Sequence, residues 1–232
     1  HSPRGRRNTP HQYRRQCCRS QSQHDSEASA KALLGTLVDL VLATRNRGKV
    51  DEMRPMLANI GFNLINQTDT DIPSPVEDGA TFVENALIKA RAVAAATGLP
   101  CIADDSGLVV SALNGAPGIF SARYAGEGAS DADNNARLLR ELEAHDDRSA
   151  YFFCCMVLLR ADDDPTPLIA TGKWRGQILT APQGQGGFGY DPLFWLPDLL
   201  QSAAELPKVQ KNTISHRGQA CAQLLSSLNA HG

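Results

Sequence analysis

The sequence has no long apolar run. Within its 232 residues, no window approaches the roughly 18 consecutive apolar residues of a membrane-spanning helix. It also has no Cys-x-x-Cys pair, because four of its six cysteines form the adjacent pairs Cys17-Cys18 and Cys154-Cys155. That absence excludes the common zinc-knuckle and thioredoxin-type motifs. We therefore expect a soluble protein with free thiols in a reducing, cytoplasmic compartment.

Acidic residues are scarce at the N-terminal end. Residues 1–31 contain seven Lys/Arg and two Asp/Glu, which leaves 16 Lys/Arg and 23 Asp/Glu in the remainder. The N-terminal segment is polar, without apolar periodicity, and weakly resembles an organelle transit segment. We predict a disordered basic extension or tag over residues 1–36 and a single folded domain over residues 37–229. An acidic domain that binds an anion needs a metal ion or clustered Lys/Arg.

The folded domain is predicted to open with a strand, a polar loop and a helix. The β-rich run Leu37–Ala43 predicts a buried strand, and a helical pattern runs from Val50 to Ile60. Between them, Thr44–Lys49 is a polar loop with Gly and Lys, although it lacks the Walker A spacing. A loop at a helix N-terminus directs backbone N–H groups at an anion. The alternative is an ordinary turn with surface basic residues.

Two adjacent carboxylates follow the next apolar run. The segment Pro100–Asp104 predicts a strand that ends in Asp104-Asp105-Ser106-Gly107, and strand ends of α/β sheets often carry ligand chemistry. A plain turn is the alternative. In the preceding loop, Glu77 and Asp78 have no local partner and are candidate metal ligands. The spacing Thr81-x-x-Glu84 is that of a capping box, which accounts for Glu84 without a metal.

Strands and helices continue to the C-terminus. The patterns predict strands at 62–67, 151–160 and 168–180, the last as one or two strands, with helices at 81–97, from Ser130 or Asp131 to about Ala144, and near the C-terminus. Ser121–Tyr124 is predicted to be a loop. The glycine-rich segment 181–189 leads into Phe188-Gly189-Tyr190-Asp191 and predicts close backbone approach to a ligand. Ser215 is a plausible cap, and the cations His216 and Arg217 behind it oppose the helix dipole, which suggests a nearby anion.

Together these residues indicate magnesium-dependent nucleotide chemistry. Carboxylates beside phosphate-binding amides and Lys/Arg are what Mg²⁺-assisted phosphate chemistry requires. Aromatic side chains over a glycine-rich loop can stack on a base. The residues alone therefore predict an enzyme that acts on a nucleotide with Mg²⁺, and they predict nothing more specific.

Six segments, in order, resemble the non-canonical purine nucleoside triphosphate pyrophosphatases, also called inosine triphosphate or dITP/XTP pyrophosphatases. The segments are residues 43–49, 81–90, 103–108, 117–124, 187–192 and 215–218. The resemblance covers Leu37 to about Leu228. Arg45 departs from it, because the family commonly has Gly there.

The resemblance implies an elongated, two-lobed α/β fold with a mixed sheet and a nucleotide in the central cleft, in a homodimer. It implies hydrolysis of ITP, dITP and XTP to the monophosphate and pyrophosphate, with no nucleic-acid or membrane partner. It makes Asp105 the proton acceptor and a Mg²⁺ ligand, with Glu77 as a second ligand. Its implied substrate contacts are Thr44, Arg45, Asn46, Arg47, Gly48, Lys49, Ser106, Phe188, Gly189, Tyr190, Asp191, Lys211, His216 and Arg217. A water that attacks the α-phosphorus is the mechanistic hypothesis.

Three alternatives remain open from sequence. A septum-associated nucleotide pyrophosphatase of related fold would prefer other bases. A catalytically silent nucleotide-binding module would have the same motifs without turnover. A nucleic-acid-binding protein would use the basic N-terminal segment.

Overall fold

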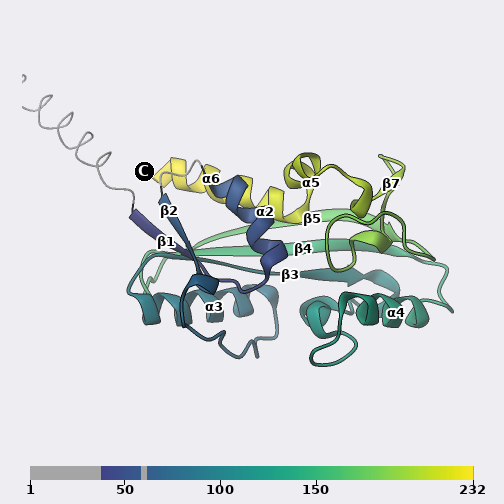
Figure 1. The fold of residues 1–232 in the computed structure, drawn as a ribbon, viewed down its shortest axis with the longest axis horizontal. Coiled ribbons are helices and arrows are strands. Elements are labelled where there is room, and N and C mark those ends of the chain that lie inside the picture. The colour runs from purple at the N-terminus through teal and green to yellow at the C-terminus, as the bar shows by residue number, and fades with distance from the viewer. Residues whose placement is uncertain (1–37, 59–61, 232) are drawn as a thin grey trace, which may run out of the picture. The chain divides into compact units, whose positions relative to one another are not determined.

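The computed structural model describes residues 38–58 and 62–231, and in this part of the chain the strands form a seven-stranded sheet of order β2-β1-β3-β4-β5-β6-β7 (Figure 1). β1 pairs in parallel with β3, whereas β3 to β7 pair antiparallel in succession. The sheet is therefore mixed, and the predicted α/β class is confirmed. The strands are β1 (Val38–Leu42), β2 (Phe62–Asn66), β3 (Cys101–Val110), β4 (Ser149–Leu159), β5 (Leu168–Ile178), β6 (Phe194–Leu196) and β7 (Gln201–Ser202).

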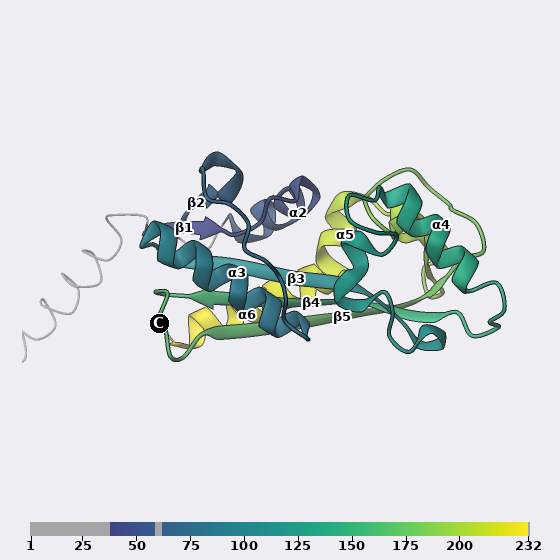
Figure 2. The same ribbon diagram turned by 90° about the horizontal axis from the view of Figure 1, so that it is seen from below.

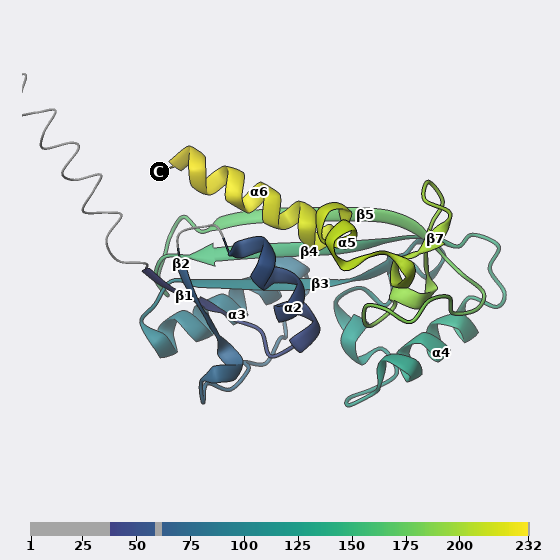
Figure 3. The same ribbon diagram turned by 45° about the horizontal axis from the view of Figure 1, so that its top comes forward.

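Helices cover both faces of this sheet. α2 and α6 pack on one face, with α6 along β4 and β5 (Figure 3), and α3 packs on the other face over β3 and β4 (Figure 2). Ile102 belongs to the core cluster of α2 and α6, and its neighbour Ala103 belongs to that of α3, as strand alternation requires. The helices are α2 (Arg47–Leu57), α3 (Phe82–Thr97), α4 (Asp131–Glu141), α5 (Lys208–Ile214) and α6 (His216–His231).

A third apolar cluster lies where β3, β4 and β5 run on toward α4. It includes Phe152 and Trp174 from the strands and Leu138 from α4. Short 3₁₀ helices complete this part: η2 (Ser111–Leu113), η3 (Gly118–Arg123), η4 (Asp191–Leu193) and η5 (Ala203–Glu205), while η1 (Gln67–Asp69) follows β2. The predicted division into a basic extension over 1–36 and one domain over 37–229 stays a prediction, because residues 1–37 lie outside the described residues.

The central strand corrects the sequence prediction. Asp104 was expected to end a strand, but β3 continues from Cys101 through both aspartates to Val110. It continues because β4 pairs with it along its whole length, with Asp104 opposite Met156 and Asp105 opposite Cys155. On its other edge β3 pairs with β1 only as far as Ile102, so the polar residues sit in a strand with one neighbour.

Other boundaries also differ from expectation. α2 begins at Arg47 rather than after Lys49, Ser121 lies in η3 rather than in a loop, and α5 was not predicted. The segment predicted as one or two strands at 168–180 is the single strand β5. Ile60 and the Cys17-Cys18 pair lie outside the described residues.

The expectation of free thiols is confirmed for the cysteines in the described part, because Cys101, Cys154, Cys155 and Cys221 are free and buried. No helix among the described residues is both long and apolar enough to cross a membrane.

Candidate functional site

Asp104 and Asp105 project from opposite faces of β3. Asp104 is fully buried on the face covered by α2 and α6, and Asp105 is 7% exposed on the face covered by α3. A strand places successive side chains on opposite faces, so neighbouring carboxylates meet different partners. The two aspartates must therefore be treated as two sites.

On the α3 face, Asp105 shares a lysine with Glu77. The Lys89 Nζ lies 3.2 Å from Asp105 Oδ1 and 2.8 Å from Glu77 Oε2. Asn85, one turn before Lys89 in α3, donates from Nδ2 to Asp105 Oδ2 at 3.3 Å. The same Asn85 accepts a hydrogen bond from Gly79 N at 2.9 Å, which fixes the loop that carries Glu77.

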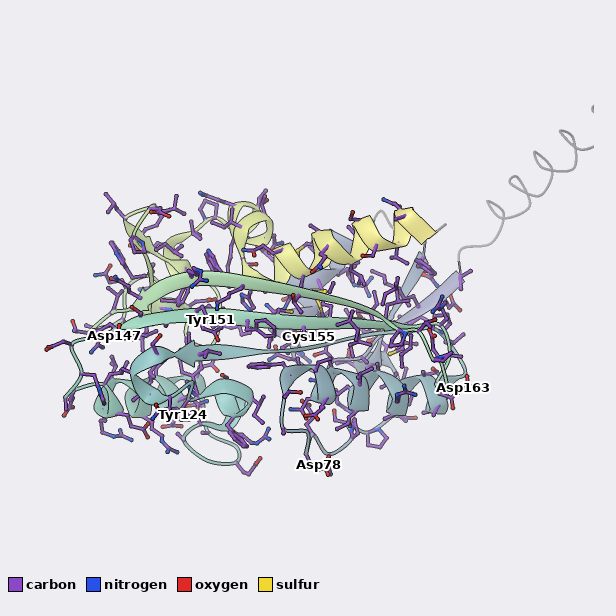
Figure 4. The ribbon with its side chains drawn as sticks, turned by 180° about the vertical axis from the view of Figure 1, so that it is seen from behind. Asp78, Tyr124, Asp147, Tyr151, Cys155 and Asp163 are labelled. Carbon is purple, nitrogen blue, oxygen red and sulfur yellow. The ribbon has the colours of Figure 1, made fainter. Side chains whose placement is uncertain are left out.

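The other acids near this loop lie apart from Asp105. Asp78 is exposed, on the outer side of the loop (Figure 4). Glu84 accepts from the Thr81 hydroxyl at 2.9 Å, and its own N–H donates to Thr81 Oγ1 at 3.3 Å, which caps α3. Thr81 caps α3 as its spacing predicts, but the Glu84 carboxylate accepts from the Thr81 hydroxyl and not from a backbone amide, so only the Thr81 half of the predicted capping box is present.

Burial and charge set the protonation of this group. Burial raises the pKa of Asp105 above its usual value, and the negative charges of Glu77 and Asp104 raise it further. The positive charges of Lys89 and Lys49 lower it, but they do not outweigh the rise. Burial acts to lower the pKa of Lys89, but the charges of Asp105, Asp104 and Glu77 raise it above its usual value. Lys89 is therefore held as a cation between two carboxylates.

On the opposite face, Asp104 sits between two cations. Lys49 Nζ lies 2.9 Å from Asp104 Oδ2, and Arg217 Nε lies 3.5 Å from the same oxygen. Burial acts to raise the pKa of Asp104, but the charges of Lys49, Arg217 and Lys89 outweigh it and hold this pKa well below the usual range. Asp104 thus stays ionised and fixes both cations.

The ion pairs continue from Arg217 into a buried network. Arg217 pairs with Glu52 of α2, whose other oxygen lies 2.8 Å from Lys211 Nζ, and Lys211 also pairs with Asp191. All four side chains are at most 7% exposed. Arg217 additionally donates to Ser106 Oγ at 2.9 Å, which ties α6 to β3. Removal of one partner from such a network leaves a buried charge uncompensated.

A cavity of about 200 Å³ opens beside this network. Its wall includes both cationic and aromatic side chains. Ten of the predicted substrate-contact residues line it: Asn46, Lys49, Ser106, Phe188, Gly189, Tyr190, Asp191, Lys211, His216 and Arg217. The remaining predicted residues, among them Asp105 and Glu77, do not line it.

His216 forms an aromatic wall of the cavity. Its ring stacks on Phe152 with centroids 4.8 Å apart and an interplanar angle of 13°. Burial, together with the charges of Arg217 and Lys211, lowers the pKa of His216 well below its usual value. A neutral imidazole offers one N–H donor and one ring-nitrogen acceptor, and its buried Nδ1 has no partner in the described part of the chain.

The predicted phosphate loop forms the start of α2. Asn46 caps this helix by accepting a hydrogen bond from Lys49 N at 3.2 Å, and Thr44 Oγ1 accepts from Asn46 N at 3.2 Å. Arg45 is exposed and donates to Ile72 O at 3.2 Å, so it bonds to the loop before Glu77 rather than to the cavity. Arg47, in the first turn, is exposed.

Gly48 makes room for an aromatic ring. A Cβ at this position would lie 2.7 Å from Cδ1 of Phe188, so only glycine lets the ring approach the first turn of α2. Phe188 in turn lies near the cations, with its ring centroid 5.3 Å from Lys211 Nζ and 5.7 Å from Arg217 Cζ.

Sequence reasoning misses three residues that organise the site: Asn85, Lys89 and Glu52. Asn85 and Lys89 are spaced four apart, which places both on one face of α3. Glu52 follows Lys49 by three residues on α2 and is buried beside Met53. Polar residues that recur at helical spacing beside an apolar stripe were the available signal.

The charges around β3 are nearly balanced. Four cations, Lys49, Lys89, Lys211 and Arg217, each pair with at least one of five carboxylates, Glu52, Glu77, Asp104, Asp105 and Asp191. An incoming polyanion therefore meets cations that are already neutralised. Positive charge supplied together with the polyanion would be favourable here.

The model of the Ham1 family matches residues 40–227. The chain is 54% identical over 191 residues to a dITP/XTP pyrophosphatase of Vibrio cholerae, covering 82% of this chain and 96% of that protein. It is 56% identical over 190 residues to a protein of the same name from Aromatoleum aromaticum, covering 82% and 96%. A solved HAM1 protein from Coxiella burnetii is 49% identical with a TM-score of 0.78, covering 84% of this chain and 100% of that one.

Proposed function

The chain belongs to the Ham1 family, and from this premise we propose that it hydrolyses non-canonical purine nucleoside triphosphates, ITP, dITP and XTP, to the monophosphate and pyrophosphate. Relatives that are at least half identical over 96% of their length and are named dITP/XTP pyrophosphatase support this activity. The observation that carries it in this chain is the cavity lined by Phe188, His216, Lys211 and Arg217 on one face of β3, the strand that carries Asp104 and Asp105. The enzyme would remove deaminated purine nucleotides from the precursor pool.

The proposed metal is Mg²⁺, held by Glu77 and Asp105. No three His, Cys, Asp or Glu side chains in the described part of the chain are grouped to hold a metal on their own. Mg²⁺ commonly takes only one or two carboxylates, with phosphate oxygens and water as the other ligands. Glu77 and Asp105 fit this pattern because a single cation, the Lys89 ammonium, already contacts both of them. When bound, Mg²⁺ would neutralise charge on the phosphates during hydrolysis.

The purine base is proposed to occupy the cavity. Phe188, Tyr190 and the His216–Phe152 stack supply aromatic surface, and the neutral His216 ring has one N–H to donate to an oxo oxygen of the base. Donors directed at the 6-oxo group would face an amino group in adenine and remain unpaired. Each buried unpaired group costs about 1–3 kcal/mol, which disfavours ATP.

With the base in the cavity, the triphosphate of the bound nucleotide is proposed to extend out of the cavity past the end of β1. Lys49 lies on the cavity side of β3 and Lys89 on the opposite side, and β3 has no strand neighbour on that edge beyond Ile102. Asp105, held by Asn85 and Lys89, would accept the proton of the water that attacks the α-phosphorus. Pyrophosphate would be the leaving group, near the cations of α2 and α3.

Two further proposals rest on the family resemblance: a homodimer, and a cytoplasmic location. Sedimentation equilibrium of the purified chain tests the first, and a single monomeric species at all concentrations would contradict it. Fractionation of the source cells tests the second.

A substrate panel tests the proposed activity. We expect pyrophosphate release from ITP, dITP and XTP with Mg²⁺ to exceed that from ATP and GTP by at least about tenfold in kcat/KM. Modified pyrimidine triphosphates form the second arm. A preference for pyrimidines would favour the septum-associated enzymes and contradict the proposal.

A further inference from the structure

Gly189, between the cavity-lining residues Phe188 and Tyr190, is held by α4. Its N–H donates to Asp131 Oδ2 at 2.7 Å, and its carbonyl oxygen accepts from Asn135 Nδ2 at 2.9 Å. Asp131 and Asn135 are four residues apart and therefore share one face of α4. The backbone N–H and the carbonyl oxygen of Gly189 are thus both fixed by one face of α4.

The position of Gly189 determines those of its neighbours. Gly189 has a φ of 63°, which favours glycine and allows the chain to turn sharply between Phe188 and Tyr190. Phe188 packs against Gly48 at the start of α2, and the Tyr190 hydroxyl donates to Ser121 O at 2.8 Å. A shift of the Gly189 backbone would therefore move aromatic surface on two sides of the cavity.

α4 is held in place by its cap, by side-chain hydrogen bonds and by a buried leucine. Ser130 and Asp133 form a capping box at its N-terminus. Asn134 accepts from Ala125 N at 2.7 Å and donates to Ala122 O at 3.3 Å, and Leu138 is fully buried. The helix can therefore serve as a fixed support for the 188–190 turn.

We propose that Asp131 and Asn135 are positioning residues for the purine-binding pocket, which fix Gly189 and through it Phe188 and Tyr190. The proposal rests on the proposed function. It predicts an effect on nucleotide binding rather than on the hydrolytic step, because Asp105 and its partners project from the other face of β3.

Kinetics on ITP provide the first test. For Asp131→Ala we expect KM to rise about fivefold to tenfold, the effect of losing one hydrogen bond to a charged group at an exposed position, with kcat changed less than about twofold. Asn135→Ala should change KM in the same direction. Asp131→Asn keeps an acceptor oxygen for Gly189 N–H and should restore KM to near the wild-type value.

Asp133→Ala is the matched control. It removes the same charge from the same helical turn and also breaks the capping box, but Asp133 does not contact Gly189. We expect its Tm to fall and its KM to stay unchanged. A KM rise in Asp133→Ala equal to that in Asp131→Ala would mean that helix stability causes the effect, and would overturn the proposal.

Hydrogen–deuterium exchange provides a readout that needs no substrate. Peptides covering residues 184–192 should exchange faster in Asp131→Ala than in the wild type or in Asp133→Ala, because the Gly189 amide loses its acceptor. Unchanged exchange overturns the proposal, and so does faster exchange with an unchanged KM. If the wild type does not hydrolyse ITP, the proposed function is wrong. The exchange comparison then still tests whether Asp131 and Asn135 hold Gly189 in place.

Discussion

Asp104 and Asp105 show how two identical side chains acquire different properties from the face of the strand they occupy. Asp104 meets Lys49 and Arg217, and its pKa is held low, whereas Asp105 meets Asn85 and Lys89, and burial raises its pKa. The alternation itself follows from a strand and could be predicted from the sequence. Which helix covers which face could not, because that depends on contacts between distant segments.

Asp105→Asn should separate binding from hydrolysis. The amide keeps the shape of the side chain but cannot accept the proton, so we expect pyrophosphate release to fall at least about a hundredfold while nucleotide affinity changes only a few-fold. Pyrophosphate release and equilibrium nucleotide binding measure the two effects. Asp78→Asn, on the exposed side of the same region, should leave both near wild type. Activity retained in Asp105→Asn would remove Asp105 from the mechanism.

Asp104→Asn should reduce stability in a pH-dependent way. At pH 7 it leaves the buried Arg217 and the partly buried Lys49 with fewer counter-charges, which costs about 3–5 kcal/mol of unfolding free energy. Because the folded-state pKa of Asp104 is lowered, its contribution is complete above the unfolded value of about 3.9 and is lost as the pH falls below it.

Urea unfolding of both proteins between pH 7 and pH 2.5 measures this linkage. The difference between wild type and Asp104→Asn should be constant down to about pH 5 and shrink below about pH 4. Asp163→Asn, an exposed acid in the turn between β4 and β5 (Figure 4), should show little difference at any pH. A difference that grew with acidification would contradict the assignment.

At the level of elements, local signals predicted helix ends better than strand ends. α3 begins after its cap Thr81 and ends at Gly98, whose φ is 66°, as its sequence predicts. The Ser215 side chain likewise accepts from Gly218 N at 3.2 Å, at the start of α6. β3 was predicted too short because the strand that supports its polar centre, β4, is distant in sequence.

The loop that carries Glu77 gives a prediction about metal requirement. Glu77→Gln removes one of the two proposed ligand charges, so we expect the Mg²⁺ concentration for half-maximal activity to rise about tenfold. Glu84→Gln, in the first turn of α3 where Glu84 bonds to the Thr81 hydroxyl, should leave that concentration unchanged. Activity measured across a Mg²⁺ titration compares the two. Equal Mg²⁺ dependence in both variants would exclude Glu77 as a ligand.

The contact between β5 and α6 gives a stability prediction. A Cβ at Gly172 would lie 1.9 Å from His216 O and 2.8 Å from Ala220 N, both backbone atoms that cannot rotate away. Gly172→Ala should therefore destabilise the fold by about 1–3 kcal/mol, which is a fall in Tm of several degrees for a chain of this size. Thermal unfolding measures it, with Thr171→Ala on the exposed side of β5 as the control. An unchanged Tm would show that the helix has room to move.

For the whole molecule, the sequence predicted many residues of the site, though not the roles of Glu52, Asn85 and Lys89, and it did not predict how the site is divided across the sheet. The cavity and Asp104 lie on one side of β3, and Asp105, Glu77 and Lys89 lie on the other. That division, and the nearly complete pairing of the cations, arise from the packing of α2, α3 and α6 on two faces. In the proposed enzyme the nucleotide reaches both sides past the end of β1, with Mg²⁺ supplying the missing positive charge.

The position of bond cleavage is the decisive test of water attack at the α-phosphorus. Hydrolysis of dITP with Mg²⁺ in ¹⁸O-labelled water, followed by mass spectrometry of both products, reports which phosphorus the water attacks. Attack at the α-phosphorus yields deoxyinosine monophosphate carrying one ¹⁸O atom, together with unlabelled pyrophosphate. Label in the pyrophosphate, or release of the diphosphate and inorganic phosphate, would contradict it.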